Sequence, residues 1–135
     1  MLKVLDLFSG IGAFSLGLER TGGFKTVAFC EIEEYPRKIL AQHWPDVPIF
    51  KDIRTLKGAD LGTIDVICGG FPCQDVSAAA YAHGRNGIEG KRSGLYGEAL
   101  RIAEELGKPI LILENVRALL SDGFVTVLQD LCAIG

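Results

Sequence analysis

Short apolar runs alternate with longer segments of helical period along all 135 residues, and this alternation constrains the fold more than any other feature. The expected strands are 3–8, 25–30, 47–50, 64–68 and 109–113, and the expected helices are 11–21, 34–43, 95–106 and 118–134. Such alternation indicates a parallel sheet with crossover helices. Because nearly every strand is apolar throughout, helices are expected to cover both faces. The sequence therefore predicts one α/β domain with a doubly wound, mostly parallel sheet.

The ends and faces of the helices are also marked. The Gly22-Gly23 pair and Gly107 stand where left-handed caps would stop the first and third helices. In the helix 34–43, Tyr35, Ile39 and Leu40 are expected to form the apolar face.

Composition narrows the class of protein. Hydrophobic residues make up 48% of the chain, which is enough for a substantial core. No apolar run approaches the roughly 20 residues of a membrane span, and the start does not resemble an export signal. A cytoplasmic protein without a membrane partner is expected.

The four cysteines do not form a metal-binding pattern. They include no C-x-x-C pair, and only two histidines accompany them, so no metal site is expected. Cys30, Cys68 and Cys132 are interpreted as reduced, buried spacers, whereas Cys73 lies in a different context.

The charge balance is unusual for a protein that grips DNA. The net charge is −3, although affinity for a duplex comes largely from Lys and Arg that neutralise phosphates. The one locally basic segment lies between Ser77 and Leu95 and contains Arg85, Lys91 and Arg92. It is interpreted as a loop that closes over a phosphate-bearing substrate, or as a plain surface loop.

In doubly wound sheets ligands bind beyond the carboxyl ends of the strands, and the first strand is followed there by a glycine turn. Gly10 and Gly12 allow the backbone to approach a ligand at a helix amino terminus. A complete dinucleotide motif would need a third glycine where this chain has Ser15. A smaller nucleoside ligand and an ordinary strand-to-helix turn both remain open.

Acidic residues follow the second and third strands. Glu31 lies about 20 residues beyond the glycine turn, where a carboxylate can accept ribose hydroxyls. Asp52 is placed to accept an adenine amino group, or to start the turn that follows it.

The fourth strand leads into Gly70-Phe71-Pro72-Cys73-Gln74. Pro72 stiffens the backbone, and Cys73 is presented at the binding edge rather than inside a strand. A cysteine there is a candidate nucleophile if its thiolate is stabilised; the alternative is a structural cysteine in a loop.

The fifth strand runs directly into Glu114. An acid in that position is expected to be partly desolvated, which raises a carboxyl pKa and suits proton donation. The alternative is an acid that starts the next helix.

In this order, the segment Asp6–Phe14, Glu31, Asp52, the Phe71–Gln74 loop and the Glu114-Asn115-Val116 triplet closely resemble the DNA (cytosine-5) methyltransferase family. The resemblance extends along the whole chain, and its last two motifs are the most specific. It implies the Rossmann-like fold of S-adenosylmethionine-dependent methyltransferases.

The resemblance also implies a role for individual residues. The implied S-adenosylmethionine contacts are Phe8, Ser9, Gly10, Gly12, Glu31, Ile32, Asp52, Ile53, Gly70 and Leu95. The implied catalytic group is Cys73 and Glu114, supported by Pro72 and by Asn115, which positions the Pro72–Cys73 loop. The implied DNA contacts are Gln74, Ser77, Arg85, Lys91 and Arg92.

The implied reaction is methylation of a flipped-out cytosine in double-stranded DNA. Cys73 would attack carbon 6, and Glu114 would hydrogen-bond or protonate ring nitrogen 3 so that carbon 5 accepts the methyl group. Loss of the carbon-5 proton and of the cysteine would then release the product.

The chain also departs from the family pattern. Members of the family continue with more strands, a Gln-Arg-Arg-type motif, a target recognition domain and a closing helix. We therefore expect residues 1–135 to be a single partial catalytic domain, incomplete and weak or inactive alone. Alternatives are one subunit of a split methyltransferase completed by a partner chain, a non-catalytic remnant that binds the cofactor or a protein partner, or, outside the family, a small-molecule methyltransferase or nucleotide-binding flavodoxin-like domain. An apolar surface exposed where the missing lobe would pack also predicts self-association.

Overall fold

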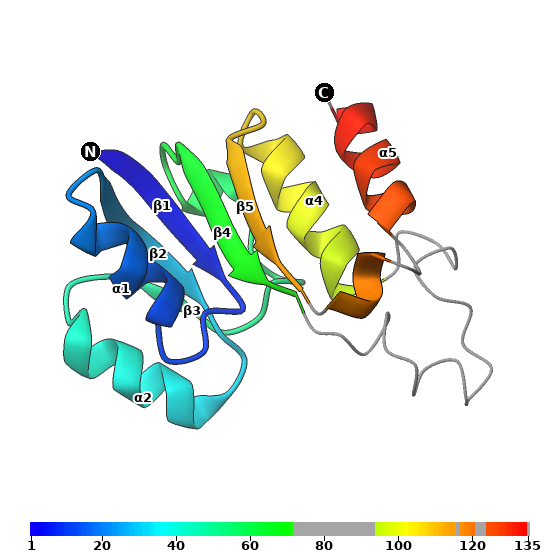
Figure 1. Cartoon of the computed structure of the whole chain (residues 1–135). Coiled ribbons are helices and arrows are strands. Elements are labelled where there is room, and N and C mark those ends of the chain that lie inside the picture. The colour runs from blue at the N-terminus through cyan, green and yellow to red at the C-terminus, as the bar shows by residue number, and fades with distance from the viewer. Residues whose placement is uncertain (72–93, 116, 121–123, 135) are drawn as a thin grey trace.

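The computed structural model describes residues 1–71, 94–115, 117–120 and 124–134 (Figure 1). The strands are β1 (Leu2–Leu7), β2 (Phe24–Cys30), β3 (Ile49–Phe50), β4 (Val66–Gly70) and β5 (Ile110–Glu114). The α-helices are α1 (Ala13–Arg20), α2 (Glu34–His43), α4 (Leu95–Glu105) and α5 (Phe124–Ile134). Two short 3-10 helices are η1 (Gly58–Asp60) and η3 (Arg117–Leu120).

The strands form one sheet in the order β3-β2-β1-β4-β5, and every described pair is parallel. The chain builds outward from β1 to β3 and then returns to the other side of β1 with β4. This reversal is the topological switch point of a doubly wound sheet. The predicted α/β fold class is confirmed.

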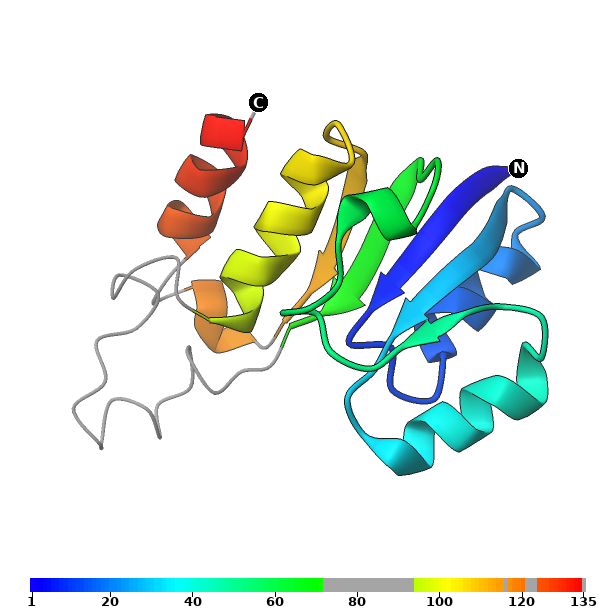
Figure 2. The ribbon, with the colours of Figure 1, turned by 180° about the vertical axis from the view of Figure 1, so that it is seen from behind.

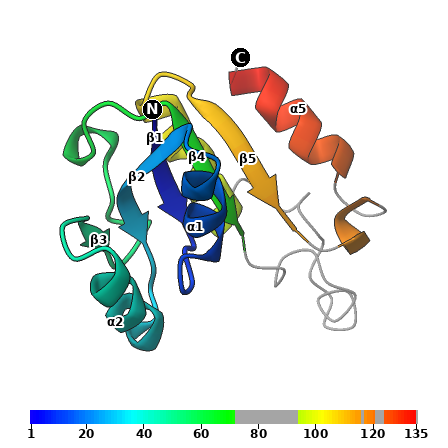
Figure 3. The same cartoon turned by 60° about the vertical axis from the view of Figure 1, so that its left-hand side comes forward.

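Helices cover the two faces of the sheet, as the apolar strands require (Figures 1 and 3). On one face α1 packs on a small cluster of Val4, Val66 and Cys68. On the other face α4 packs on the larger core that contains Leu5 and Ile67. Figure 2, seen from behind, shows α4 and η1 in front of the strands.

A bulge in β2 shifts its side chains from one face to the other. Val4 pairs with Thr26, but the next residue, Leu5, pairs with Ala28, so Val27 is the extra residue. Thr26 therefore shares the α1 face with Val4. Among the described residues, the Thr26 hydroxyl is the one buried side-chain polar atom without a hydrogen-bond partner.

A buried carboxyl ties β1 to α1. Asp6 is 1% exposed, and the Ser15 hydroxyl donates a hydrogen bond of 2.6 Å to its Oδ2. Burial raises the pKa of Asp6 to about 7, against hydrogen bonds from Ser15 and Cys68, with the Glu31 charge adding to the rise. Ser15, which interrupts the glycine motif, is thus a structural partner of β1.

Several boundaries differ from those expected. The expected helix 118–134 is replaced by η3 and then α5, which begins at Phe124; the intervening Ser121-Asp122-Gly123 consists of turn-forming residue types. β1 ends at Leu7, because Phe8 adopts a positive φ of 55°. The two predicted left-handed caps are confirmed at Gly22 and Gly107, with φ of 79° and 77°.

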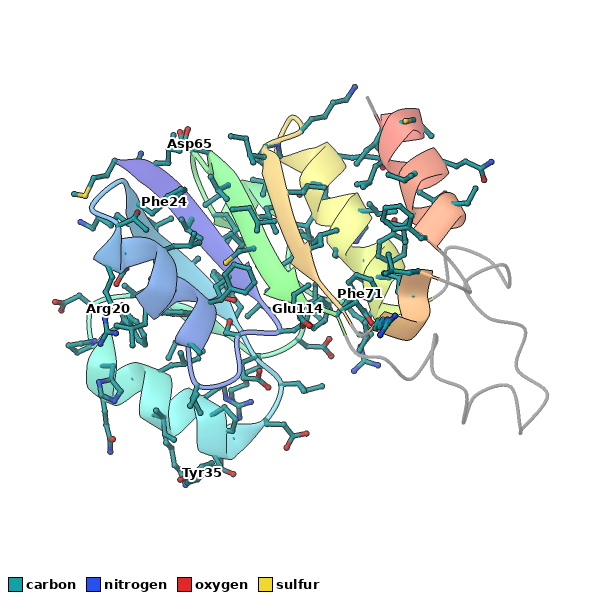
Figure 4. The ribbon with its side chains drawn as sticks, viewed as in Figure 1. Arg20, Phe24, Tyr35, Asp65, Phe71 and Glu114 are labelled. Atoms are coloured by element: carbon teal, nitrogen blue, oxygen red, sulfur yellow. The ribbon has the colours of Figure 1, made fainter. Side chains whose placement is uncertain are left out.

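Two side chains expected inside the protein face outward. Tyr35 is 73% exposed (Figure 4), because α2 buries Leu40 instead. Cys132 is exposed because α5 turns Val127 and Ile134 inward. The expected burial of Cys30 and Cys68 is confirmed.

The unpartnered hydroxyl of Thr26 generates the first prediction. Thr26→Val keeps the shape and removes the desolvated hydroxyl, so the free energy of unfolding should rise by about 1 kcal/mol. Thr26→Ser is the matched control, since it keeps the hydroxyl and loses a methyl group and should be less stable than the unaltered chain. Urea unfolding followed by circular dichroism measures both, and a destabilised valine variant would contradict the assignment.

The raised pKa of Asp6 generates the second prediction. A carboxyl whose pKa is higher in the folded state stabilises the fold fully when the pH is below its unfolded pKa, near 3.8. This stabilisation is lost as the pH rises through about 7. Between these values the free energy of unfolding should fall by up to about 1.4 kcal/mol per pH unit. Asp6→Asn should remove this slope, whereas Asp46→Asn, at an exposed site, should retain it. Equal slopes for the unaltered chain and Asp6→Asn in urea unfolding from pH 4 to 8 would refute the assignment.

Candidate functional site

A cleft of about 450 Å³ lies at the carboxyl ends of β1 to β4, which is the size of a small-molecule site. The predicted residues that line it are Phe8, Glu31, Ile32, Asp52, Ile53, Gly70 and Leu95. Sequence reasoning missed Cys30, Glu33 and Lys51, which also line it. Each of the three is adjacent in sequence to a predicted residue. Including one more residue on either side of the positions predicted after each strand would have found them.

Glu31 is a buried acid of the cleft with hydrogen bonds to two backbone amides. The residue is 8% exposed, and its Oε2 accepts a hydrogen bond of 2.7 Å from the Gly10 amide. Its Oε1 accepts one of 2.8 Å from the Glu33 amide. Each carboxylate oxygen can accept a second hydrogen bond, so Glu31 is fixed in place and still able to accept two hydroxyl donors.

The glycine turn holds this geometry together. Gly10 has a positive φ, and a Cβ at this position would meet no atom within 4 Å, which leaves the space beside Glu31 open. Gly12 has a different role: a Cβ there would lie 2.6 Å from Trp44 and 2.8 Å from Leu40, so glycine allows the turn to pack on α2.

Ser9 also supports the turn from within. Its hydroxyl donates to the Asp6 carbonyl at 2.6 Å and accepts from the Cys30 amide at 3.3 Å. Ser9, Gly10 and Gly12 are not among the residues that line the cleft, and their cofactor contacts stay predictions.

Asp52 and Ile53 form the wall contributed by the segment after β3. The Arg54 guanidinium and amide hydrogen-bond to the Asp52 carboxylate and hold its pKa below the ordinary value. Ile53 is 4% exposed and belongs to the core, whereas Ile32, which also lines the cleft, is 58% exposed. The cleft thus offers an ionised acid together with a buried and an exposed apolar side chain.

Cys30 lines the cleft but is not prepared for nucleophilic chemistry. Burial, with the charges of Asp52 and Glu31 adding to it, raises the pKa of the Cys30 thiol to about 12. Since the thiolate is the nucleophile, Cys30 is inert near neutral pH.

Glu114 reaches the same edge of the sheet from β5 (Figure 4). It pairs in register with Gly70, and a Cβ on Gly70 would lie 2.7 Å from Glu114 Oε2. Glycine is therefore what allows the acid to lie against the cleft wall. Glu114 is exposed, so the expected partial desolvation is not met in the structure.

Asn115 fixes the backbone where β4 ends. Its Nδ2 donates a hydrogen bond of 3.0 Å to the Phe71 carbonyl, and the Phe71 ring packs on Tyr96 with 5.0 Å between centroids. Phe71 lies two positions before Cys73, and the positioning of the Pro72–Cys73 loop by Asn115 stays a prediction.

The remaining predicted residues fall outside the described part of the chain; they are Pro72, Cys73, Gln74, Ser77, Arg85, Lys91 and Arg92. In the described ranges no group of three or more His, Cys, Asp or Glu could hold a metal ion. None of the helices described is long and apolar enough to cross a membrane.

Relatives with this sequence pattern are known. The chain is 38% identical over 119 residues to type II methyltransferase M2.BsuMI of Bacillus subtilis. The aligned region covers 85% of this chain and 29% of that protein. It is 40% identical over 115 residues to type II methyltransferase M.CviJI of Paramecium bursaria Chlorella virus IL3A, covering 84% and 30%. The chain therefore spans about 30% of the length of these relatives.

Solved structures share the fold. A prophage-encoded E. coli protein described as a DNA modification methyltransferase superposes with a TM-score of 0.74 at 26% identity, covering 99% of this chain and 37% of that one. Spodoptera frugiperda DNMT2 gives a TM-score of 0.75 at 19% identity, covering 99% of this chain and 41% of that one, which is a likeness of fold.

The sequence model of C-5 cytosine-specific DNA methylases matches residues 2–133. The chain thus belongs to the C-5 cytosine-specific DNA methylase family, as its motifs predicted.

Proposed function

We propose that this chain carries the cofactor-binding and catalytic part of a DNA cytosine-5 methyltransferase. The observation that carries the proposal is the meeting of two sites at Gly70. This residue lines the cleft that contains Glu31, and its α-carbon lies against the Glu114 carboxylate. A methyl donor in the cleft would thus lie beside the acid that contacts the base.

The cleft residues fit S-adenosylmethionine. Glu31 has lone pairs left for the two ribose hydroxyls, and the open space beside Gly10 leaves room for the sugar. Ile32 and Ile53 offer apolar surface to the adenine ring. The Asp52 oxygens already accept four contacts from Arg54, so the adenine amino group would replace an Arg54 N–H as a donor to this carboxylate. When bound, the cofactor supplies an electrophilic methyl group.

The chain's own residues would act on the base. The Cys73 thiolate forms a bond to carbon 6 of a flipped cytosine while Glu114 hydrogen-bonds or protonates nitrogen 3. The electron pair gained by the ring makes carbon 5 nucleophilic. After methylation a base removes the carbon-5 proton, and the bond between Cys73 and carbon 6 breaks, which restores the aromatic ring and the free cysteine.

Double-stranded DNA is the proposed substrate, but these residues supply little of the grip. The net charge is −3, and the proposed phosphate and base contacts are restricted to Gln74, Ser77, Arg85, Lys91 and Arg92. Most of the charge that neutralises the phosphates would come from polypeptide equivalent to the other 70% or so of the relatives. We propose that a complementing chain or segment supplies this charge and that the chain alone binds and methylates DNA weakly.

The role of Glu31 yields the third prediction. Glu31→Gln replaces one of the two accepting carboxylate oxygens with an NH2 group, which cannot accept a hydrogen bond. The Kd for S-adenosylhomocysteine should therefore rise by on the order of tenfold. Glu33→Gln is the matched control, because Glu33 lines the same cleft and contributes its amide rather than its side chain to the Glu31 contact. Isothermal titration calorimetry measures both, and equal losses would contradict a special role for Glu31.

The role of Cys73 yields the fourth prediction. With 5-fluorocytosine in duplex DNA the carbon-5 substituent cannot leave as a proton, so the Cys73 adduct should accumulate. The adduct is expected when the chain, cofactor and DNA are mixed with a polypeptide that carries a recognition domain, and not from the chain alone. Denaturing gels with peptide mass mapping detect it; Cys73→Ser should abolish it, and Cys132→Ser, which alters an exposed thiol on α5, should not.

The outcomes separate the candidate roles. Efficient site-specific methylation by the pure chain would contradict the need for further polypeptide. A chain that binds S-adenosylhomocysteine but forms no adduct under either condition would be a non-catalytic binding remnant.

A further inference from the structure

One arginine on α4 holds the segment that follows β3. Arg101 Nη2 donates hydrogen bonds to the Ile53 carbonyl at 2.9 Å and the Leu56 carbonyl at 3.0 Å. These partners are 48 and 45 positions away in sequence. The contact therefore joins the segment after β3 to α4, which lies between β4 and β5 in the chain.

The guanidinium is itself oriented by two acids on its own helix. Arg101 Nε lies 2.7 Å from Glu98, one turn earlier, and its Nη1 lies 2.6 Å from Glu105, one turn later. Glu105 adds a second link, because its Oε2 accepts a hydrogen bond of 2.7 Å from the Gly58 amide. That bond, together with Arg101, lowers the pKa of the Glu105 carboxyl. α4 thus hydrogen-bonds to three backbone groups of the segment 53–58, which are the Ile53 and Leu56 carbonyls and the Gly58 amide.

The gripped segment is part of the cleft wall. Asp52 and Ile53 line the cleft, and Asp52 starts a turn in which its carbonyl accepts from the amides of Thr55 and Leu56. No strand or helix covers residues 51–57, so the sheet does not fix their position. The buried side chains of Ile53 and Leu56 anchor the segment in the core, and Arg101 adds a constraint on its backbone, while Leu95 at the start of the same helix lines the cleft directly.

Arg101 has little left to offer to an external partner. It lines a shallow depression of about 800 Å³ with Arg54 and Lys57, which by charge alone would suggest a phosphate contact. However, four N–H···O hydrogen bonds are already made within the protein, and a guanidinium has five N–H donors. The planar fork with several fixed acceptors is typical of an arginine that organises structure.

We propose that Arg101 is a positioning residue that sets the adenine side of the cleft, by holding the Ile53 and Leu56 carbonyls and through them the Asp52–Ile53 wall. This inference rests on the proposed function, in which that wall receives the adenine of S-adenosylmethionine. It predicts that Arg101 controls selectivity for the purine 6-amino group without touching the ligand.

The fifth prediction compares two ligands that differ at that group. S-adenosylhomocysteine carries the 6-amino group, whereas S-inosylhomocysteine carries a 6-oxo group that cannot donate to Asp52. The unaltered chain should bind the adenosyl ligand more tightly by on the order of tenfold. Arg101→Ala and Arg101→Lys should reduce this ratio to less than about threefold, since an ammonium keeps the charge but not the planar fork.

The controls separate positioning from general stability. Lys57→Ala removes a neighbouring cation from the same depression and should keep the full ratio. The ratio of the two Kd values, measured by calorimetry well below the unfolding midpoint of each variant, does not change when a variant is only less stable. Arg101→Lys decides the question if Arg101→Ala does not fold.

The outcomes distinguish this inference from the function on which it rests. An unaltered chain that binds neither ligand would overturn the proposed function and this inference with it. An unaltered chain that binds both ligands equally would overturn this inference together with the proposed contact between Asp52 and the amino group. Arg101 variants that retain the full preference would overturn only the role of Arg101.

Discussion

The close approach of β1 and β4 in the middle of the sheet is the constraint on which the site depends. Leu7 and Gly69 are in register, and a Cβ on Gly69 would lie 2.2 Å from the Leu7 carbonyl oxygen. The pairing can therefore form only with glycine in β4. β1 is followed by α1 on one face, and α4, the next described helix after β4, covers the opposite face; such a divergence opens a crevice at the strand ends.

Four carboxylates near that edge show how environment separates residues that look equivalent in the sequence. Asp6 is buried under the turn, and its raised pKa marks it as a structural group. Glu31 accepts two backbone amides and stays open to hydroxyl donors. Asp52 is held ionised by Arg54, and Glu114 lies exposed over Gly70. A position after a strand brings an acid to the edge, but neighbouring donors and burial determine its chemistry.

The sequence predicted the structure well where a local conformation requires a particular type of residue. Apolar runs and glycine caps located the strands and the helix ends, and the spacing from the glycine turn located Glu31. It was uninformative where the cause is a contact between distant segments. The β2 bulge depends on pairing with β1, Tyr35 faces outward because α2 is buried through Leu40, and Arg101 reads as an ordinary surface residue of an amphipathic helix.

Two such distant contacts involve α4, one at each end of the helix. At the amino-terminal end Tyr96 packs on Phe71, whose carbonyl is held by Asn115. At the carboxyl-terminal end Arg101 and Glu105 hold the segment after β3. Since α4 contacts both Phe71, two positions before Cys73, and the segment that contains Ile53, a displacement of this helix would move both segments. Under the proposed function the base-binding and cofactor-binding sides would therefore be aligned by one rigid element, which suits a methyl transfer whose rate depends on the relative position of two substrates.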